Sequence, residues 1–358
     1  MTEASSSSNS NSNTVTNTIT NTVTNNKSND DSTLLVFSDL DGTLIHYPES
    51  LPEENDDNLL LKLPPSSTGM RGVVSSQTLR LTQELRRQGK KFILISGMRT
   101  TTLLNRLPYL PKADAYCSEA GGRIFYPTAE DAKGCLFKIE PKTFEGATKE
   151  DLKPFGIVED MDWRRNVEEY TGKYDLDGSS FETLGDSTAS TPVEQRVGSR
   201  LWDYARDLQK MGYVIDVKGY SSCFRLNLGK QTQISGDDFY GHIDKKMLAK
   251  AGLATSVNLS CIDIYPAISG KKNCCQYLGE KFFPQASLSI NAVCLCDDDN
   301  DIEMALAVQH AYIPSLSSET MDAEIQKCKE HFTETYKFDS AGFGTGASDL
   351  ALRMILER

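Results

Sequence analysis

The sequence lacks the features that mark several common classes of protein. Its 358 residues include only 4 histidines, at scattered positions, and 9 cysteines without the paired spacing of a zinc site. Acidic residues number 50 against 38 lysines and arginines, and the net charge of −12 disfavours partners such as nucleic acid or an anionic membrane. No apolar run approaches the length that spans a bilayer. We therefore expect a cytoplasmic protein with reduced cysteines and no membrane or nucleic-acid partner.

Residues 1–32 also lack the apolar content of a folded segment. They are rich in serine, asparagine and threonine and contain neither a hydrophobic signal core nor an arginine. This composition disfavours a signal or transit peptide. Because such a segment cannot bury enough apolar surface to order itself, we predict a disordered tail.

The most informative segment is residues 39–43, Asp-Leu-Asp-Gly-Thr, which directly follows a short apolar run. Positions two apart in an extended chain point the same way, so Asp39 and Asp41 can face one site. Gly42 permits a sharp turn, and the Thr43 hydroxyl can bond to nearby backbone. Such a pair suits phosphoryl transfer, because one carboxylate can attack phosphorus while the other handles the leaving group's proton. Alone, the segment could equally be an acidic surface turn.

Three later apolar runs also end in polar residues. Runs 92–95, 261–266 and 292–296 precede Ser96-Gly97, Lys271-Lys272 and the acidic cluster 297–301, respectively. Short runs of this kind are typical of strands buried on both faces of a parallel sheet, and helical patterns separate them. The alternation predicts an α/β fold with a Rossmann-like open parallel sheet, which places ligands at the carboxyl ends of its strands. We expect these polar groups to converge on one crevice.

With these motifs in this order, residues 33–358 resemble the haloacid dehalogenase (HAD) superfamily of phosphohydrolases. The first motif is 39–43, the second is Ser96, the third is Lys271 or its neighbour Lys272, and the fourth is 297–301. Two segments depart from the family pattern, without loss of a catalytic atom. Cys296 replaces the usual glycine, and residues 96–99 read Ser-Gly-Met-Arg where relatives often have Thr-Gly-Arg.

The resemblance also implies a second domain. Lys271 lies 175 residues after Ser96, and in the superfamily a large insertion here is the second type of cap, an inserted α/β domain. Cof-like sugar phosphatases, sucrose-phosphate phosphatase and eukaryotic phosphomannomutase have this cap. We predict core at 33–121 and 259–358, and cap at 122–258. The expected cap helices are 192–211 and 237–251, the expected cap strands are 122–126, 135–139, 213–217 and 223–228, and 118–122 is the expected turn from core to cap.

The resemblance assigns roles to individual residues. Asp39 would be the nucleophile that forms an aspartyl-phosphate, and Asp41 the general acid and then base, its pKa raised by the neighbouring carboxylate. Mg²⁺ is the implied cofactor. The implied metal ligands are Asp39, the Asp41 carbonyl and Asp297, with Asn300 and Asp301 close by; the implied phosphate ligands are Ser96, Gly97 and Lys271; and Lys218 and Arg225 on cap strands are candidates for substrate contact.

The expected partner is a small phosphorylated metabolite, with a sugar phosphate favoured. A phosphomutase with the same aspartyl-phosphate, and a catalytically silent binding or regulatory protein, are the alternatives. No duplicated cationic site in the cap supports a mutase, and the intact carboxylates argue against a silent site. Ser96 could instead cap the next helix, and we expect Asp298 and Asp299 at a helix start and Trp163 and Trp202 in the core. The sequence does not identify which phosphate ester is the substrate, nor the oligomeric state.

Overall fold

The computed structural model describes residues 33–48, 59–65, 69–172, 193, 196, 199–231, 243, 245–258, 261–338 and 344–358. The predictions for the tail and for the beginnings of both cap helices lie outside these ranges. Residues 32–358 form one compact unit. Among the described residues, no helix is long and apolar enough to cross a membrane.

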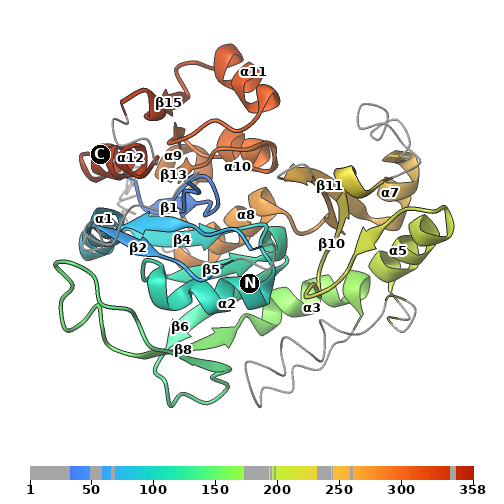
Figure 1. Ribbon diagram of the computed structural model, residues 1–358, viewed down its shortest axis with the longest axis horizontal. Helices are drawn as coiled ribbons and strands as arrows, with labels where there is room; N and C mark the ends of the chain where they lie inside the picture. The colour runs from blue at the N-terminus through green and yellow to red at the C-terminus, as the bar shows by residue number, and fades with distance from the viewer. Residues whose placement is uncertain are drawn as a thin grey trace, which may run out of the picture. The chain divides into compact units, whose positions relative to one another are not determined.

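A nine-stranded sheet dominates the fold (Figure 1). Its order is β15-β14-β13-β1-β4-β5-β6-β8-β7, so β1 lies between β13 and β4. The strands from β15 to β5 in this order run parallel, and β6, β8 and β7 continue the sheet antiparallel. The strands are β1 (Leu35–Ser38), β4 (Lys91–Ile95), β5 (Ala115–Ser118), β6 (Arg123–Thr128), β7 (Phe137–Ile139), β8 (Phe155–Glu159), β13 (Ala292–Leu295), β14 (His310–Ile313) and β15 (Phe332–Glu334).

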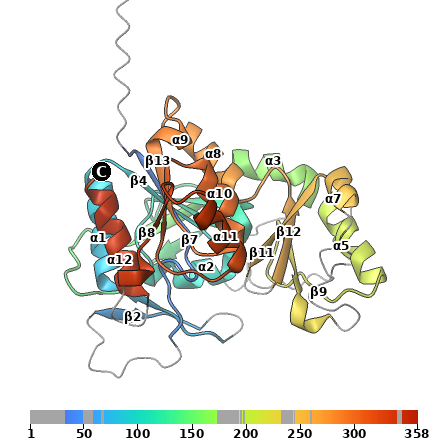
Figure 2. The ribbon, with the colours of Figure 1, turned by 90° about the horizontal axis from the view of Figure 1, so that it is seen from above.

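Both faces of this sheet are buried, as a continuous apolar run requires. In β1, Val36 joins one core cluster while Leu35 and Phe37 join the other, because successive side chains point to opposite faces. Helices α1 (Ser76–Arg87), α2 (Thr100–Arg106) and α12 (Thr345–Leu356) share the Val36 cluster, and α1 lies beside α12 (Figure 2). Helices α3 (Met161–Thr171), α8 (Lys271–Phe282), α10 (Ile302–Ala307) and α11 (Glu319–Lys327) share the other, and α9 (Leu288–Asn291) precedes β13. Trp163 packs in this second cluster, as predicted.

A four-stranded antiparallel sheet of order β11-β12-β10-β9 has its own core. Its apolar face packs against two helices through Leu201, Leu208, Phe224 and Ile262, and Trp202 is buried there, as predicted. The elements are β9 (Ile215–Asp216), β10 (Phe224–Asn227), β11 (Leu253–Asn258), β12 (Cys261–Pro266), α5 (Arg200–Lys210) and α7 (Lys245–Ala251). This sheet and its helices are an α/β unit of the kind expected for the cap, and we call them the cap unit.

The two sheets do not divide at the predicted boundaries. Strands β6, β7 and β8 fall in the range expected for the cap, yet they extend the nine-stranded sheet, where Phe125 and Phe155 pack in the same cluster as Tyr116. The run 261–266, interpreted as a strand of the parallel sheet, is instead β12 of the cap unit, so that interpretation was wrong. An apolar run indicates a buried strand but does not specify the strand with which it pairs.

The turn at 118–122 also differs from its prediction, because it joins β5 to the antiparallel β6 within the large sheet. Glu119 and Ala120 have φ angles of 55° and 56° there, which are rare for residues other than glycine. The segment after His46 includes the hairpin of β2 (Leu60–Lys62) and β3 (Val73–Ser75). The short 3₁₀ turns are η2 (Leu107–Tyr109), η3 (Glu119–Gly121), η5 (Leu228–Lys230), η6 (Asp299–Asp301) and η7 (Tyr336–Phe338).

Candidate active site

Asp39 and Asp297 emerge side by side from the carboxyl ends of neighbouring strands. The parallel register pairs Ser38 of β1 with Leu295 of β13, and the Asp39 amide donates to the Leu295 carbonyl at 3.0 Å. Both strands therefore end at the same edge, and the next residues of each project from it. The predicted convergence of the first and fourth motifs is confirmed.

Gly42 allows the turn after Asp39 to pass close to Asp297. Its φ angle is +88°, and a β-carbon there would lie 2.1 Å from Asp297 Oδ2. Any side chain would therefore collide with this carboxylate. Thr43 Oγ1 donates to Asp297 Oδ1 at 2.7 Å, so the prediction that this hydroxyl bonds to nearby backbone was wrong. The first motif orients the carboxylate of the fourth.

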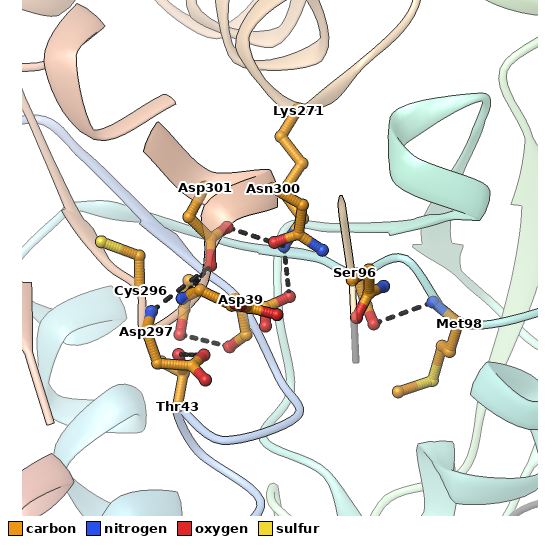
Figure 3. A network of polar contacts seen from close by, with 12 residues as sticks. Asp39, Thr43, Ser96, Met98, Lys271, Cys296, Asp297, Asn300 and Asp301 are labelled. Carbon is orange, nitrogen blue, oxygen red and sulfur yellow. Dashed lines mark hydrogen bonds and ion pairs between the residues drawn. The ribbon is translucent and has the colours of Figure 1, made fainter. Parts of the chain in front are cut away.

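Lys271 lies at the centre of the cluster (Figure 3). Its Nζ donates to Asp39 Oδ1 at 2.7 Å, to Asp301 Oδ1 at 2.6 Å and to Asn300 Oδ1 at 3.0 Å. Its side chain is 1% exposed, whereas the adjacent Lys272 is exposed. Of the two lysines left open by the sequence, the structure therefore brings Lys271 to the carboxylates.

Burial dominates the electrostatics of the cluster. It raises the pKa of Asp39 to about 8, opposed by Lys271 and reinforced by Asp301. Burial, followed by the charges of Asp39 and Asp301, raises the pKa of Asp297 well above its usual range. Burial would lower the pKa of Lys271, but Asp301 and Asp39 raise it above its ordinary value. The cluster thus contains more acidic groups than one ammonium group can neutralise.

This donor set fits a hard divalent cation. Oxygen atoms of Asp39, Asp297 and Asp301 all lie within 4.8 Å of one another, and all three residues are buried. Carboxylate oxygens are the ligands that Mg²⁺ prefers, and a divalent charge would offset the burial and the repulsion that raise these pKa values. Asp39 and Asp297 were predicted as metal ligands, whereas Asp301 was predicted only to lie close by; in the structure its carboxylate belongs to the same cluster.

Two acidic residues of the fourth motif lie at a helix start, as predicted. Asp298 is the N-cap of η6 and its side chain accepts from the Asp299 amide at 2.8 Å. Asp301 Oδ2 accepts a hydrogen bond from the Asp297 amide at 3.3 Å, and this bond joins the first and last residues of the motif.

Ser96 and Gly97 lie in the loop after β4. Ser96 Oγ accepts from the Met98 amide at 3.1 Å, and the N-cap residue of α2 is Arg99, so Ser96 does not cap that helix. A β-carbon on Gly97 would lie 2.3 Å from Asn258 Nδ2. Figure 3 shows Ser96 near the carboxylate cluster, joined by a hydrogen bond to Met98 rather than to the cluster.

Asp41 has partners that the sequence did not indicate. Arg106 Nη1 donates to Asp41 Oδ1 at 2.9 Å and to Tyr47 Oη at 2.8 Å, and Tyr47 Oη donates to Asp41. Burial, followed by the Asp41 charge, raises the pKa of Tyr47. The expected charge neighbour of Asp41 was a carboxylate, whereas the group that touches it is a guanidinium. Arg106 ends α2, where a basic residue usually faces solvent, so only its burial could have revealed it.

The two candidate residues of the cap unit differ in their surroundings. Arg225 donates to Asp263 through Nε at 2.5 Å and Nη2 at 2.7 Å, whereas Lys218 is exposed. Both line a cavity of about 670 Å³ that Asp41 and Arg106 also line. Both predicted residues therefore line the same cavity as the second carboxylate of the first motif.

Three buried carboxylates and a buried lysine therefore lie together at the carboxyl end of the parallel sheet, where open α/β folds place their ligands. The sequence matches none of the family models and none of the curated proteins with which it was compared. Among solved structures, the chain resembles the sucrose-phosphatase of Synechocystis sp. PCC6803 in complex with sucrose and phosphate. The TM-score is 0.51 and the identity 13%, over 90% of this chain and 98% of that one. This likeness confirms the predicted fold.

Two further structures cover a similar share of the chain. The haloacid dehalogenase-like hydrolase yhjK from Bacillus subtilis has a TM-score of 0.47 and 14% identity over 90% of this chain and 92% of that one. The HAD-superfamily phosphatase BT1666 from Bacteroides thetaiotaomicron has a TM-score of 0.44 and 14% identity over 92% and 97%.

Proposed function

We propose that this chain is a Mg²⁺-dependent phosphomonoester hydrolase that acts through an aspartyl-phosphate on a small phosphorylated metabolite. The observation that carries the proposal is the buried contact of Lys271 with Asp39 and Asp301 beside Asp297. Burying three carboxylates around one lysine costs stability, so a purely structural cluster of this composition would be unfavourable. A divalent cation would offset that cost when it binds, and the anionic phosphate could then approach the carboxylates.

The chain's own groups supply a complete reaction. An Asp39 oxygen attacks phosphorus, the ester P–O bond breaks, and the leaving oxygen takes a proton from Asp41. Asp41 then accepts a proton from water as that water attacks the phosphorus of the aspartyl-phosphate, which releases phosphate and restores Asp39. Lys271 provides a positive charge to the transferring group. Asp39, the Asp41 carbonyl and Asp297 would hold Mg²⁺, with Asp301 and Asn300 beside it, and the cation would supply charge neutralisation.

Arg106 and Tyr47 hold the Asp41 carboxylate in place before substrate arrives. Asp41 accepts hydrogen bonds from both, and these bonds fix its orientation toward the cavity. In the first step Asp41 must carry a proton, so this pairing has to loosen or rearrange when the ester binds. Ser96 and the Gly97 amide, in the loop after β4, are the proposed ligands of the phosphate oxygens.

A sugar phosphate is the favoured substrate class. The structural neighbour from Synechocystis was solved with sucrose and phosphate, and the cavity of about 670 Å³ beside Asp41 can contain a molecule of sugar size. The ester itself is best found by a phosphate-release screen with Mg²⁺ over hexose phosphates, sucrose phosphate, phosphoglycolate, nucleotides and flavin mononucleotide.

The screen is paired with two variants of similar charge change. Asp39→Asn removes the nucleophile and should abolish turnover while the protein stays folded by circular dichroism. Asp299→Asn removes a carboxylate of the same acidic run that touches neither Lys271 nor Asp39, and it should retain most activity. Acid quenching of the wild type during turnover should trap a phosphorylated protein whose label is released by hydroxylamine.

The outcomes separate the alternatives. Phosphate release by Asp39→Asn at a rate near the wild type would mean that the nucleophile is misassigned. Transfer between positions of one sugar that depends on a bisphosphate activator would indicate a phosphomutase. Absence of phosphate release from the whole panel, with Mg²⁺ present, would favour a binding or regulatory protein.

A further inference from the structure

The cavity beside Asp41 is strongly cationic although the chain as a whole is acidic. Five cationic side chains line it against the two carboxylates of Asp41 and Asp216, and Asp263, which pairs with Arg225, brings the acids to three. The cavity therefore carries a positive excess of two charges in a chain whose net charge is −12. The five cations are Arg99, Arg106, Lys218, Arg225 and Lys230.

Arg106 points to a ligand most directly. Its side chain is 1% exposed, and it uses Nη1 for Asp41 and Tyr47. Its Nε and Nη2 atoms are buried and have no hydrogen-bond partner among the residues that the structure describes. Buried donors of a guanidinium are costly when unsatisfied, and a carboxylate or phosphate satisfies two of them in a fork.

The rim of the cavity contributes further positive charge. Lys218 and Lys230 are exposed, and neither forms an ion pair with another described residue. Arg99, in contrast, pairs with Asp216 of β9, and Arg225 pairs with Asp263 of β12. Hydroxyl groups of a neutral sugar would need acceptors as well as donors, and this cavity is rich in donors.

From these observations we infer that the phosphoester carries a second anionic group, a carboxylate or a second phosphate, on the part that leaves as the alcohol. Arg106 and the rim lysines bind that group while the cluster around Lys271 holds the transferred phosphate. This inference rests on the proposed function and narrows its substrate class. The proximity of Asp41 to Arg106 places the second anion on the leaving-group side of the reaction.

The test compares esters that differ in this group alone. Sorbitol 6-phosphate is set against 6-phosphogluconate, in which a carboxylate replaces the terminal hydroxymethyl group, and glucose 6-phosphate against glucose 1,6-bisphosphate, which adds a phosphate. Glycerol 3-phosphate against 3-phosphoglycerate gives a third pair with a shorter skeleton. At constant free Mg²⁺, kcat/KM should be higher for the anionic member of a pair by about tenfold, which corresponds to about 1.4 kcal/mol. Comparison of the first pair with the second tells a carboxylate from a phosphate.

Variants assign the preference to the cavity. Lys218→Gln and Lys230→Gln should each lower the ratio of anionic to neutral kcat/KM several-fold through KM, and Arg106→Gln should lower it most. Because Arg106 also holds Asp41, its variant slows all esters, but the ratio cancels effects common to both. Lys210→Gln is the matched control, since Lys210 is an exposed lysine of the cap unit that pairs with Asp207 and does not line the cavity. Its ratio should equal that of the wild type.

Each failure has its own signature. Equal rates for neutral and anionic members, or a ratio that none of the three variants changes, would overturn this inference and leave the phosphatase intact. Uniform weakening of all esters would mean that these cations serve the transferred phosphate instead. The enzyme could be active on other esters and hydrolyse none of these pairs. In that case the affinity of Asp39→Asn for each member of a pair is measured by calorimetry. Equal affinity for the neutral and the anionic member would refute the proposal of a second anionic group. Inactivity towards every ester refutes the proposed function itself.

Discussion

Replacing Lys271 by methionine tests whether its buried contacts hold the site together. The substitution keeps the length of the side chain but removes the ammonium group that touches Asp39 and Asp301. Breaking a buried ion pair by removing one partner typically costs about 3–5 kcal/mol, because the other charge stays buried. Here two contacted carboxylates, and Asp297 beside them, lose that neutralisation. We expect the free energy of unfolding at pH 7 to fall by at least about 3 kcal/mol.

The assay is urea unfolding in a chelator, with Lys272→Met as the matched control. Lys272 is the next residue of the same helix and is exposed, so its loss should cost no more than about 0.5 kcal/mol. Adding Mg²⁺ should recover part of the stability of Lys271→Met, because the cation binds only the folded cluster.

The pH dependence of the free energy of unfolding is a second test of the same reasoning. The pKa of Asp39 is already raised to about 8, above its ordinary value of 3.8, so the folded state binds protons that the unfolded state releases between these pH values. Without Lys271 the pKa rises further, and Lys271→Met should become more stable as pH falls from 8 to 5. If Lys271→Met loses no more stability than Lys272→Met, the reasoning about the buried cluster is refuted.

Three further predictions concern two residues of the acidic site and a histidine of β14. Asp297→Asn should stabilise the metal-free protein, because it removes a carboxylate that burial and the charges of Asp39 and Asp301 disfavour, and should abolish the rise of the melting temperature on Mg²⁺ addition. Gly42→Ala should cost more than about 1 kcal/mol and abolish activity, since φ is +88° and the new methyl group meets Asp297; wild-type unfolding would contradict this. Burial lowers the pKa of His310 to about 4, so stability is lost as pH falls from 6.5 towards 4, at less than about 1.4 kcal/mol per unit. His310→Gln should flatten that slope in urea titrations, and an unchanged slope would assign it to other groups.

The sequence was sufficient to predict the acidic residues at the end of the parallel sheet, because the signals for them are local. An apolar run followed at once by carboxylates specifies both a buried strand and the residues at its end, which is how Asp39 and Asp297 were found. For the third motif, the sequence predicted only that the lysine is Lys271 or Lys272, since a helix start does not show which side chain turns inward. In the structure the side chain of Lys271 is the buried one.

The pairing of strands was harder to predict from the sequence. The run 261–266 has the same apolar character as β13, yet it pairs with β10 and β11. Such a choice depends on contacts between distant segments, and no window of sequence contains them. The same reason hid Arg106, whose partners Asp41 and Tyr47 lie 65 and 59 positions earlier.

The central position of β1 in the sheet has a consequence for biosynthesis. One neighbour of β1, the strand β4, follows soon after it, but the other is β13, and Thr43 meets Asp297 only 254 positions later. A nascent chain therefore holds an open, apolar strand edge for most of its translation, and such edges recruit other chains. Ribosome-bound fragments that end before residue 292 should aggregate when released, whereas extension through β14 closes both edges of β1 and makes the fragment soluble.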